Sequence, residues 1–568
     1  MESTGSEAPF PLIRPALADK QTLLRLYRDC EAWLQQGRFA EARAVLTELV
    51  QRNPEKLEFL NNLVALCRYG GDTEAALVHA HTAFLLAPTD HTAQVHLGHL
   101  LLEQKRYVQA GHYYQLATGS DPQDAEAWEN LAHCLGKQGQ IRPCLEVLGR
   151  ATQLQPADAR LKSAFLYHLL ALPGLSPEQR WPHLQAWDRS QSRPALGHSN
   201  SPEPARRLRI GYVSADLRQS VAAQVFGPLF FERDRGCFEL YVYSNHHSAD
   251  AETESFRADA DHWREIHALS DAQVVDLIQQ DQIDVLVDLN SLMEGNRLAV
   301  FAARPAPIQL TGPGGYIGST GLSAIGYCLA DAVMIPPEQA CWHSESPLYL
   351  SSGFHWQPRA EYADLSAADP PGLTGGRFTL GCGNDTLKLN PAVLGLWAEL
   401  LRLLPEADLL LKAPGLEEFA LQEHFQQFFV RSGVAPERIR CEGSTPPRAH
   451  LDFYRRCDLI LDPFPFNGAI STCDALWMGR PVIVRDGGHR VGASILTAVG
   501  LSDWIAADEA DYLRKACILA RAPQRVSPPG LRERLLASPI CDGKGFCAQV
   551  EGHYRRLWEA WCLKQASA

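Results

Sequence analysis

The sequence predicts two architectures in one chain: an all-α array of repeated helical hairpins, followed by an α/β region with two parallel-sheet lobes. Three observations predict this arrangement. Prolines recur at a fixed interval up to Pro156, apolar strand-like runs start at Leu208, and a break at about residues 358–374 separates these runs into two sets. A chain of 568 residues is also too long for one hydrophobic core, so two or three domains are expected.

The repeat has a period of 34 residues. Each unit ends in a proline, which cannot continue a helix and biases the preceding residue away from helical backbone angles. Seventeen residues before each proline stands the turn between two helices, and a small residue follows where the helices must approach closely. The prolines are Pro54, Pro88, Pro122 and Pro156, the turn residues are Gly37, Gly71, Lys105 and Gly139, and the small residues are Ala42, Ala76, Ala110 and Cys144. This pattern is typical of tetratricopeptide repeats, which stack into a superhelix with a concave peptide groove, and it disfavours an unrelated helical bundle with coincidental prolines.

We therefore divide the chain into five segments. The linker among them is rich in Pro, Ser, Gln and Arg and has room for one short helix. The predicted segments are an N-terminal tail at 1–20, the repeat array with a capping helix at 21–172, the linker at 173–206, a first lobe at 207–370, and a second lobe with a C-terminal helix at 371–568.

The composition disfavours several classes of protein. Hydrophobic residues make up 46% and charged residues 21%, which is ordinary for a globular protein. The net charge of −13 argues against nucleic-acid binding, because counterion release needs a basic surface. We recognise no signal peptide and no apolar run of transmembrane length, and the fifteen cysteines are scattered singly. These features predict a cytoplasmic protein with reduced thiols and no membrane insertion.

The second half alternates apolar strands with helical segments. Near-continuous apolar runs of this kind indicate parallel sheets covered on both faces. Two sets of strands predict two Rossmann-like lobes facing a cleft, with ligands beyond the carboxyl ends of the strands. The strand candidates are 208–216, 238–245, 283–290, 377–384, 407–414, 438–443, 458–463 and 481–486. Polar residues gather at their ends, namely Ser214, Asp216, Asn290, Asn384, Asp385, Lys412 and Asp462.

Several common motifs are absent. The absence of GxGxxG weakens the hypothesis of a dinucleotide oxidoreductase, and the absence of GxxxxGKS/T disfavours a P-loop nucleotidase. GxSxG and HExxH are missing too, and no metal-ligand spacing is evident. The sequence therefore predicts neither a bound metal nor a cofactor.

The stretch from Asp462 to Pro481 carries the most informative site signal. A strand ends at Asp462, a loop of Pro, Gly and Asn follows, and a helix is expected to begin near Ser471. Its free N–H groups and positive dipole end suit a diphosphate, and Asp474 one turn later could accept hydrogen bonds from ribose hydroxyls. A capping box of Ser471 and Asp474, with both side chains bonded to the helix backbone, is the slightly favoured alternative.

Two further candidates are Lys388 and His450. Lys388 follows the strand at 377–384 and could neutralise phosphate charge, although a lone lysine after a strand is usually a solvated surface residue. His450 could stack on a base, although an isolated histidine is more often a packed or surface residue.

Together the segments resemble the tetratricopeptide-containing O-linked N-acetylglucosamine transferases, glycosyltransferase family 41, especially their bacterial members. The resemblance covers nearly the whole chain and implies the two-lobed GT-B fold, with a nucleotide-sugar held mainly by the C-terminal lobe. It also implies inverting, metal-independent transfer of a sugar, GlcNAc or another hexose, from a UDP-sugar to a Ser or Thr hydroxyl of a protein. The motifs, in the family's order, are RLRIGYVSADLR, GNRLAVFAARPAPIQ, STGLSAIGYCLADA, NDTLKLNPAVLGLW, LLLKAPGL, DPFPFNGAISTCDALWMGRPVIV and HRVGASIL.

The resemblance also implies roles for residues of the second lobe. Lys388 falls on the essential lysine beside the donor phosphates, where a cation stabilises the charge that develops on the UDP leaving group. Asp474 falls on the ribose-binding aspartate. Arg490 falls on the arginine of the family's RVxxS segment, and a structural ion pair is an equal alternative for it. The donor-binding candidates are Asn384, Asp385, Thr445, His450, Asn467, Gly468, Ser471, Thr472, Asp474 and Arg490.

The chain departs from the family mainly on the acceptor and sugar side. The family's histidine after VSADLR is missing, because residues 219–222 read QSVA, and residues 291–293 read SLM where the family has Gly-His-Thr or Gly-Tyr-Thr. Segment 312–318 is altered and one residue longer, and Pro447 stands where a lysine near the ribose is expected. Either the donor sugar or the acceptor has changed, or the chain has lost transfer activity and become a binding scaffold.

The leading hypothesis is a protein O-glycosyltransferase whose repeats hold a protein or peptide acceptor. Asn61, Asn62 and Asn130 are candidates for contacts with that acceptor, with solvated or helix-capping roles as equal alternatives. The competing hypotheses are a non-catalytic adaptor with a degenerate transferase domain, and a transferase that modifies Asn or a glycan.

Overall fold

The computed structural model describes residues 26–567, with the exception of 27, 31, 35, 192, 194–195, 221, 313–317, 363, 366–369 and 522–529. The described residues form two compact units. The first unit contains those up to Gln138 together with 146–155 and 417–422, and the second contains 139–145, 156–416 and the residues from Glu423 onward.

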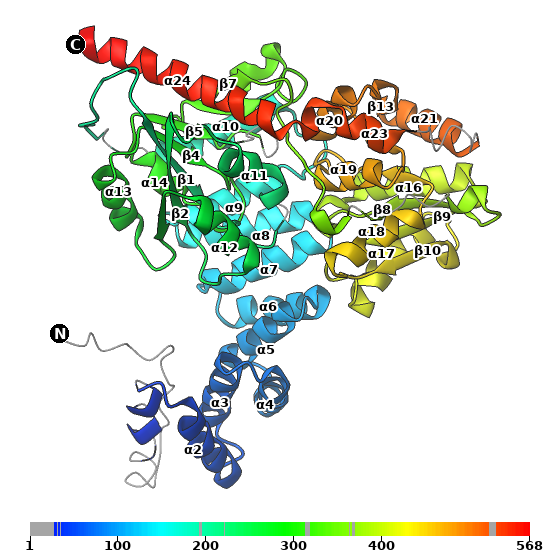
Figure 1. Cartoon of the computed structure of the whole chain (residues 1–568). Coiled ribbons are helices and arrows are strands. Elements are labelled where there is room, and N and C mark those ends of the chain that lie inside the picture. The colour runs from blue at the N-terminus through cyan, green and yellow to red at the C-terminus, as the bar shows by residue number, and fades with distance from the viewer. Residues whose placement is uncertain are drawn as a thin grey trace. The chain divides into compact units, whose positions relative to one another are not determined.

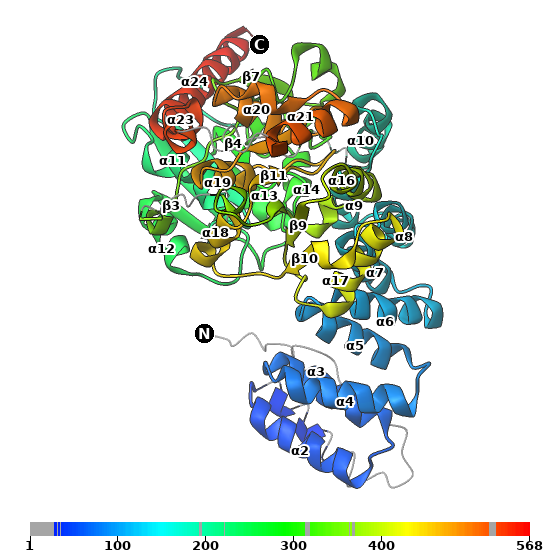
Figure 2. The ribbon, with the colours of Figure 1, turned by 90° about the vertical axis from the view of Figure 1, so that its right-hand side faces the viewer.

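The first unit is a series of helical hairpins. Figure 2 shows its helices α2 to α6 as successive, roughly parallel rows. Each helix packs on the next through buried apolar side chains. The helices are α2 (Phe39–Arg52), α3 (Leu57–Tyr69), α4 (Thr73–Leu86), α5 (His91–Glu103), α6 (Tyr107–Ser120), α7 (Ala125–Lys137) and α8 (Ile141–Leu154), the last of which is shared with the second unit.

A left-handed backbone at each hairpin turn accounts for part of the 34-residue period. Gly37, Gly71 and Gly139 have φ angles of 71°, 76° and 71°, which glycine adopts without a steric penalty. Lys105 takes the same conformation at φ 58°, although a side chain makes it less favourable by about 1–2 kcal/mol.

Close packing and helix capping recur with the same period. The four small residues predicted at helix contacts are each 0% exposed, namely Ala42, Ala76, Ala110 and Cys144. Helices α5, α7 and α9 (Ala159–Leu169) each follow an aspartate whose carboxylate accepts backbone N–H groups, and these are Asp90, Asp124 and Asp158. The repeated helical hairpins predicted from the sequence are confirmed.

The second unit contains two parallel sheets, the first of which has the order β3-β2-β1-β4-β5-β6-β7. All of its strand pairs are parallel. Most residues of β1, β2 and β4 are buried, as their apolar runs predict. The strands are β1 (Leu208–Ser214), β2 (Phe238–Ser244), β3 (His262–Glu265), β4 (Val285–Asp288), β5 (Ile308–Thr311), β6 (Tyr327–Ala330) and β7 (Ser346–Tyr349).

The second sheet has the order β10-β9-β8-β11-β12-β13 and is also parallel. In both sheets the strand order reverses once, between β1 and β4 and between β8 and β11, which is the Rossmann arrangement. The predicted fold class, a helical repeat array followed by two Rossmann-like lobes, is confirmed. The strands are β8 (Phe378–Cys382), β9 (Ala407–Lys412), β10 (Ile439–Glu442), β11 (Leu459–Leu461), β12 (Val482–Arg485) and β13 (Ile505–Ala506).

Helices cover both sheets of the second unit (Figure 1). Beside α9 they are α10 (Pro177–Gln191), α11 (Ala222–Phe231), α12 (Ala251–Asp259), α13 (Asp271–Gln280), α14 (Leu298–Ala302), α16 (Pro391–Leu403), α17 (Phe419–Arg431), α18 (Pro447–Arg455), α19 (Ile470–Trp477), α20 (Val491–Ala498), α21 (Glu509–Arg521), α23 (Leu531–Leu536) and α24 (Gly543–Ser567). The first residues of α17 belong to the first unit.

The C-terminal helix α24 returns to the first lobe, along which it runs in Figure 1. The hydroxyl groups of Tyr554 and of Tyr212 in β1 lie 3.4 Å apart. The indole N–H of Trp558 donates to the carbonyl oxygen of Glu203 at 3.0 Å, and the guanidinium of Arg206 lies 4.4 Å from the Trp558 ring centre. The end of the chain therefore ties the two lobes together.

Two regions have more regular structure than the sequence predicts. The loop-rich middle contributes β5, β6 and β7, which are four residues long each and too short to give a recognisable period. The predicted linker contains the 15-residue helix α10. Its Leu184 and Trp187 are 2% and 3% exposed, so this helix is part of the core of the second unit.

Gly98 in α5 and Gly149 in α8 offer a matched test of helix packing. A Cβ at Gly98 would lie 2.7 Å from Cε1 of Tyr114, whereas a Cβ at Gly149 would meet no atom within 4 Å. Gly98→Ala should therefore lower the free energy of unfolding by about 1–3 kcal/mol through overpacking. Gly149→Ala should raise it by about 0.5–1 kcal/mol through helix propensity. Equilibrium denaturant titrations measure both changes, and a Gly98 variant as stable as the parent would contradict this packing.

Candidate active site

The candidate site lies where the order of the second sheet reverses. Strands β8 and β11 pair side by side there, and because they are parallel their carboxyl ends lie at the same edge of the sheet. The chain leaves β8 toward Asn384 and Lys388, and it leaves β11 toward Asp462 and Asn467. Two segments that are distant in the sequence therefore meet at one point.

Lys388 connects these two segments. It ends the short 3-10 helix η4 (Thr386–Lys388), and its ammonium donates to Oδ1 of Asn384 at 3.2 Å and to the carbonyl oxygen of Asn467 at 2.8 Å. Burial lowers the pKa of Lys388, and the negative charge of Asp462 opposes that shift. The alternative of a solvated surface lysine is wrong.

The loop after β11 requires glycine at position 468. The backbone N–H of Gly468 donates to Oδ1 of Asp462 at 2.7 Å. A Cβ at this position would overlap Oγ of Ser471 and would lie 2.9 Å from Oδ1 of Asn384. The missing side chain therefore lets the backbone approach the polar groups at the ends of both strands.

Asn467 and Thr472 shape the same loop. Asn467 is 0% exposed, and its side-chain amide donates to the carbonyl oxygen of Pro463 at 3.0 Å. The hydroxyl of Thr472 donates to the carbonyl oxygen of Gly468 at 3.3 Å. Oδ1 of Asn467 is buried without a hydrogen-bond partner among the described residues, so this oxygen can still accept a hydrogen bond.

Helix α19 begins without a capping box. Its N-cap residue is Ala469, and no side chain caps it. The hydroxyl of Ser471 instead donates to Oδ1 of Asn384 at 3.3 Å, so the capping alternative is wrong. Asp474 is 4% exposed, and its Oδ1 has no partner in the part of the chain that the structure describes. Burial raises the pKa of Asp474 to about 7, with the guanidinium of Arg359 opposing the rise.

Thr445 precedes helix α18, and His450 lies within it. Thr445 is exposed in the loop before the helix, and His450 is partly buried within it. The ring centre of His450 lies 6.3 Å from that of Phe453, with the two rings nearly parallel. Burial lowers the pKa of His450 to about 4, so its imidazole is neutral at pH 7.

Asp385 and Arg490 have structural partners. The Asp385 carboxylate accepts from the backbone N–H of Leu387 at 2.9 Å and so caps η4. Nε of Arg490 lies 3.0 Å from Oδ1 of Asp486, which is the ion pair named as the alternative for this arginine.

In the first lobe, Asp216 and Asn290 meet at the carboxyl ends of β1 and β4. The Asn290 amide donates to Oδ2 of Asp216 at 2.8 Å, and burial raises the pKa of Asp216. Ser220, in the segment without the family's histidine, donates from its hydroxyl to the Asp216 carbonyl oxygen at 2.8 Å. The Ser220 carbonyl oxygen accepts from Arg359 at 2.9 Å.

Sequence reasoning assigned no role to two residues at this site. Asp462 was visible as a polar residue at a strand end, but its contact with Gly468 depends on how the loop folds. Arg359 gave no signal, because it lies in the break between the two sets of strands and reaches Ser220 only through the tertiary fold.

The three asparagines considered for acceptor binding differ in burial. Asn61 and Asn62 are 3% and 2% exposed, so a solvated role is wrong for both. The Asn61 amide donates to Oδ1 of Asp90, the N-cap of α5, at 3.2 Å. Asn130 is partly buried, with Nδ2 at 3.4 Å from Nε2 of His99.

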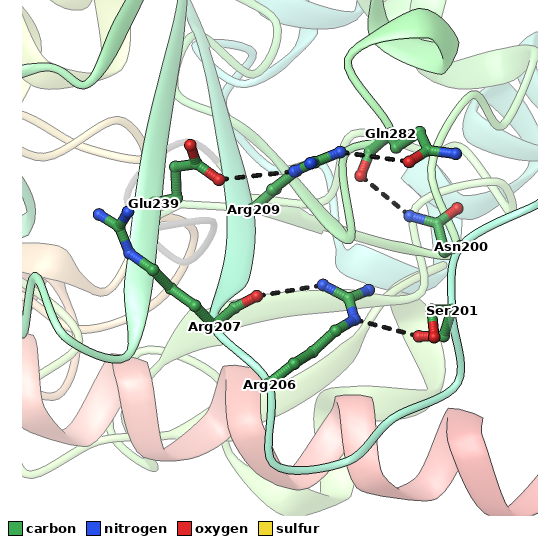
Figure 3. A pocket seen from close by; sticks show the side chains of 7 residues that line it. All are labelled: Asn200, Ser201, Arg206, Arg207, Arg209, Glu239 and Gln282. Carbon is green, nitrogen blue, oxygen red and sulfur yellow. Dashed lines mark hydrogen bonds and ion pairs between the residues drawn. The ribbon is translucent and has the colours of Figure 1, made fainter.

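A cavity of about 220 Å³ lies at the amino end of β1, the end of that strand opposite to Asp216. Figure 3 shows Arg206, Arg207 and Arg209 around it, with Arg209 pointing toward Glu239. Arg206 donates to both carboxylate oxygens of Asp284, and Nε of Arg209 lies 3.5 Å from Glu239. Nη2 of Arg207 lies 3.3 Å from Oδ1 of Asp261. Carboxylates therefore balance all three arginines, and these side chains support the start of the strand.

The described residues contain no metal cluster, no helix suited to a membrane span and no disulfide. No group of three or more His, Cys, Asp or Glu side chains is placed to hold a metal ion within the described ranges. None of the helices described there combines the length and the apolar character that a membrane span requires. The cysteines, all of which are described, form no disulfide.

Two Rossmann-like lobes, a cluster of polar residues at the strand-order reversal and a C-terminal helix that returns to the first lobe define a GT-B-type domain behind tetratricopeptide repeats. The chain belongs to glycosyl transferase family 41, which matches residues 191–361 and 378–546. Tetratricopeptide repeats match residues 32–80, 68–125 and 101–164.

Known proteins agree with this assignment. The Petunia hybrida protein named probable UDP-N-acetylglucosamine–peptide N-acetylglucosaminyltransferase SPINDLY is 33% identical over 379 residues, which cover 64% of this chain and 40% of that protein. The Arabidopsis thaliana protein SEC, named as the same kind of transferase, is 28% identical over 377 residues, or 63% of this chain and 38% of that protein. The chain thus spans about two fifths of the length of these relatives.

A solved structure covers more of the chain. A lysine-to-methionine mutant of the Thermobaculum terrenum O-GlcNAc transferase is similar with a TM-score of 0.81 and 31% identity, and the match covers 90% of this chain and 98% of that one. The family predicted from the sequence motifs is confirmed.

The buried Asp474 makes stability depend on pH in a definite direction. Its pKa is about 7 in the folded chain and near 3.8 in an exposed aspartate, so the folded state binds the proton more tightly. The contribution to stability is therefore full at low pH and is lost as the pH rises between these two values. Asp474→Asn should raise the free energy of unfolding at pH 8 by on the order of 1–4 kcal/mol and change it much less at pH 4. Denaturant titrations at both pH values test this, and a variant no more stable at pH 8 would refute it.

Proposed function

We propose that this protein transfers a sugar from a UDP-sugar to Ser or Thr hydroxyls of proteins held by its repeats. The family match over both lobes and the similarity to an O-GlcNAc transferase structure support the class of reaction. The observation that carries the proposal is the position of Lys388, whose ammonium lies between the loops that follow β8 and β11.

In the proposed complex the donor diphosphate lies at the start of α19. Free backbone N–H groups and the positive end of the helix dipole favour an anion there. Gly468 lets the loop backbone lie close to Ser471 and Asn384. Ser471 and Thr472 contribute hydroxyl groups. The neutral ring of His450 stacks on the base, and Asp474 accepts hydrogen bonds from the ribose.

The transfer is a single displacement in this proposal. The acceptor hydroxyl oxygen forms a bond to the anomeric carbon as the bond from that carbon to the diphosphate oxygen breaks, which inverts the configuration. UDP departs with the bonding electron pair, and the acceptor proton passes to water or to a phosphate oxygen. The Lys388 ammonium stabilises the charge on the departing diphosphate, a role for which one donor group is typically worth about 10²–10³ in rate. The inverting and metal-independent course rests on the resemblance to the family.

The repeats hold the acceptor polypeptide in this proposal. Stacked hairpins of this kind present a concave surface suited to an extended peptide. Asn130 is the most solvent-accessible of the three candidate asparagines. Asn61 and Asn62 are buried and support the packing of the repeats. Cysteines scattered singly favour a cytoplasmic location.

Lys388→Met tests the proposed role of the lysine. Sugar transfer should fall by about 10²-fold or more, because the leaving diphosphate loses its cation while the apolar part of the side chain is kept. Lys544→Met, which removes an exposed lysine, serves as the matched control and should leave transfer unchanged. Transfer is measured by mass spectrometry of proteins co-expressed with each variant, and circular dichroism checks the fold. Unchanged transfer by the Lys388 variant would sink the mechanism.

Altered motif positions, most of them in the first lobe, support a second candidate, a non-catalytic adaptor. Ser220, Leu292 and Pro447 stand at positions where the resemblance implies other residues. Calorimetry of the full chain with a panel of UDP- and GDP-sugars separates the two candidates. We expect a UDP-sugar to bind, and binding by no nucleotide would favour the adaptor. The mass spectra of co-expressed proteins also show whether the modified group is Ser or Thr, Asn or a glycan.

A further inference from the structure

Asp462 lies beneath the loop that follows β11. It is 1% exposed, and its Oδ1 accepts from the backbone N–H of Gly468 at 2.7 Å. Its own N–H donates to the carbonyl oxygen of Ile483 in β12 at 3.0 Å, which anchors its backbone to the sheet. A Cβ at Gly492, the second residue of α20, would lie 3.2 Å from Oδ2, so that helix also packs closely on the carboxylate.

The same carboxylate supplies the main opposite charge for Lys388. Burial lowers the pKa of Lys388, and Asp462 makes the largest contribution against that shift. Burial raises the pKa of Asp462 to about 7, and the Lys388 ammonium opposes the rise. The two groups bond to opposite sides of the peptide group between Asn467 and Gly468. An ammonium and a carboxylate placed in this way each depend on the other for their charge.

The other titratable groups that face this pair either are neutral or form hydrogen bonds with the backbone. Asp385 accepts from the backbone N–H of Leu387 and caps η4. Burial raises the pKa of Cys382, at the end of β8, to about 12, which leaves a neutral thiol. The hydroxyl of Tyr512 in α21 donates to the backbone carbonyl oxygen of Asp462 at 3.4 Å, and burial raises its pKa well above the usual value. Asp462 is therefore the carboxylate best placed to set the charge of the lysine.

We propose that Asp462 is a positioning residue of the donor site, which holds the Gly468 amide of the phosphate loop and keeps Lys388 in its ammonium form. This inference rests on the proposed function, because Lys388 acts on phosphate only where the chain binds a nucleotide-sugar. Asp462 acts through the loop and the lysine. It stabilises the ammonium before the donor arrives, so the charge is in place when the diphosphate binds.

Two substitutions separate these two roles. Asp462→Asn keeps an oxygen for the Gly468 amide and removes the charge, whereas Asp462→Ala removes both. Asp458→Asn is a matched control next to the same strand. Asp458 is also 1% exposed, but its carboxylate accepts from the backbone N–H groups of Gly372 and Thr379 at the amino end of β11.

The charge role is tested without any ligand. Full-length protein labelled with ¹³C at the lysine ε-carbons is titrated by NMR, and Lys388→Arg identifies the Lys388 signal. The pKa of Lys388 should fall by about one unit or more in Asp462→Asn, a tenfold fall in the proton affinity of the amine, and should not change in Asp458→Asn. An unchanged pKa in Asp462→Asn overturns the inference even if the chain transfers sugar, and a shifted pKa supports it even if no transfer occurs.

The loop role is tested with UDP as the probe. Calorimetry compares Asp462→Ala with Asp462→Asn at one pH, and because neither variant carries the charge, the loop is compared alone. Asp462→Ala should bind UDP at least about tenfold more weakly than Asp462→Asn, because the Gly468 amide has lost its acceptor. Equal UDP affinity of these two variants would overturn the loop role. In the active enzyme, Asp462→Asn should also move the alkaline limb of the kcat profile to lower pH, which a purely structural role would not do.

Discussion

The peptide group between Asn467 and Gly468 is the constraint on which the second lobe depends. Its carbonyl oxygen accepts from the Lys388 ammonium, and its N–H donates to the buried carboxylate of Asp462. Lys388 and Asp462 come from the loops after β8 and β11, which meet because the strand order of the sheet reverses between them. Enclosing two charges costs several kcal/mol unless each finds partners. The oxygens of Asn384 and Asn467 and the amide of Gly468 are those partners. The loops after β8 and β11 are therefore held in shape before any ligand arrives.

The repeat array obeys a different and local constraint. Each hairpin has a left-handed turn and a small buried residue, and both recur every 34 residues. An aspartate caps α5, α7 and α9 with the same period. Lys105 occupies one of the turns without glycine's freedom, so the position is dictated by the repeat geometry and not by residue preference. Contacts between consecutive helices build this unit, which is why its period is legible in the sequence.

The first lobe is altered in sequence, yet its polar groups form an ordered network. Asn290 holds the Asp216 carboxylate, Ser220 bonds to the Asp216 backbone, and Arg359 bonds to the Ser220 backbone. Arg359 is also the cation that opposes the raised pKa of Asp474 in the second lobe. The altered segment around Ser220 is therefore held in place by hydrogen bonds to its backbone and hydroxyl groups.

Sequence alone determined the repeats, the two sets of buried strands and the positions of Lys388 and Asp474, because hydrophobic periods and family motifs are written in neighbouring residues. Only the tertiary structure decided how the polar side chains are used. Ser471 bonds to Asn384 and leaves its helix uncapped, and Arg490 pairs with Asp486. The short strands β5 to β7 and the buried face of α10 also escaped prediction, because four residues show no period and a buried face depends on what packs against it. The physical reason is common to all of these cases. The role of a polar group is set by which distant segments come within hydrogen-bond reach, as when Lys388 meets a carbonyl 79 residues away.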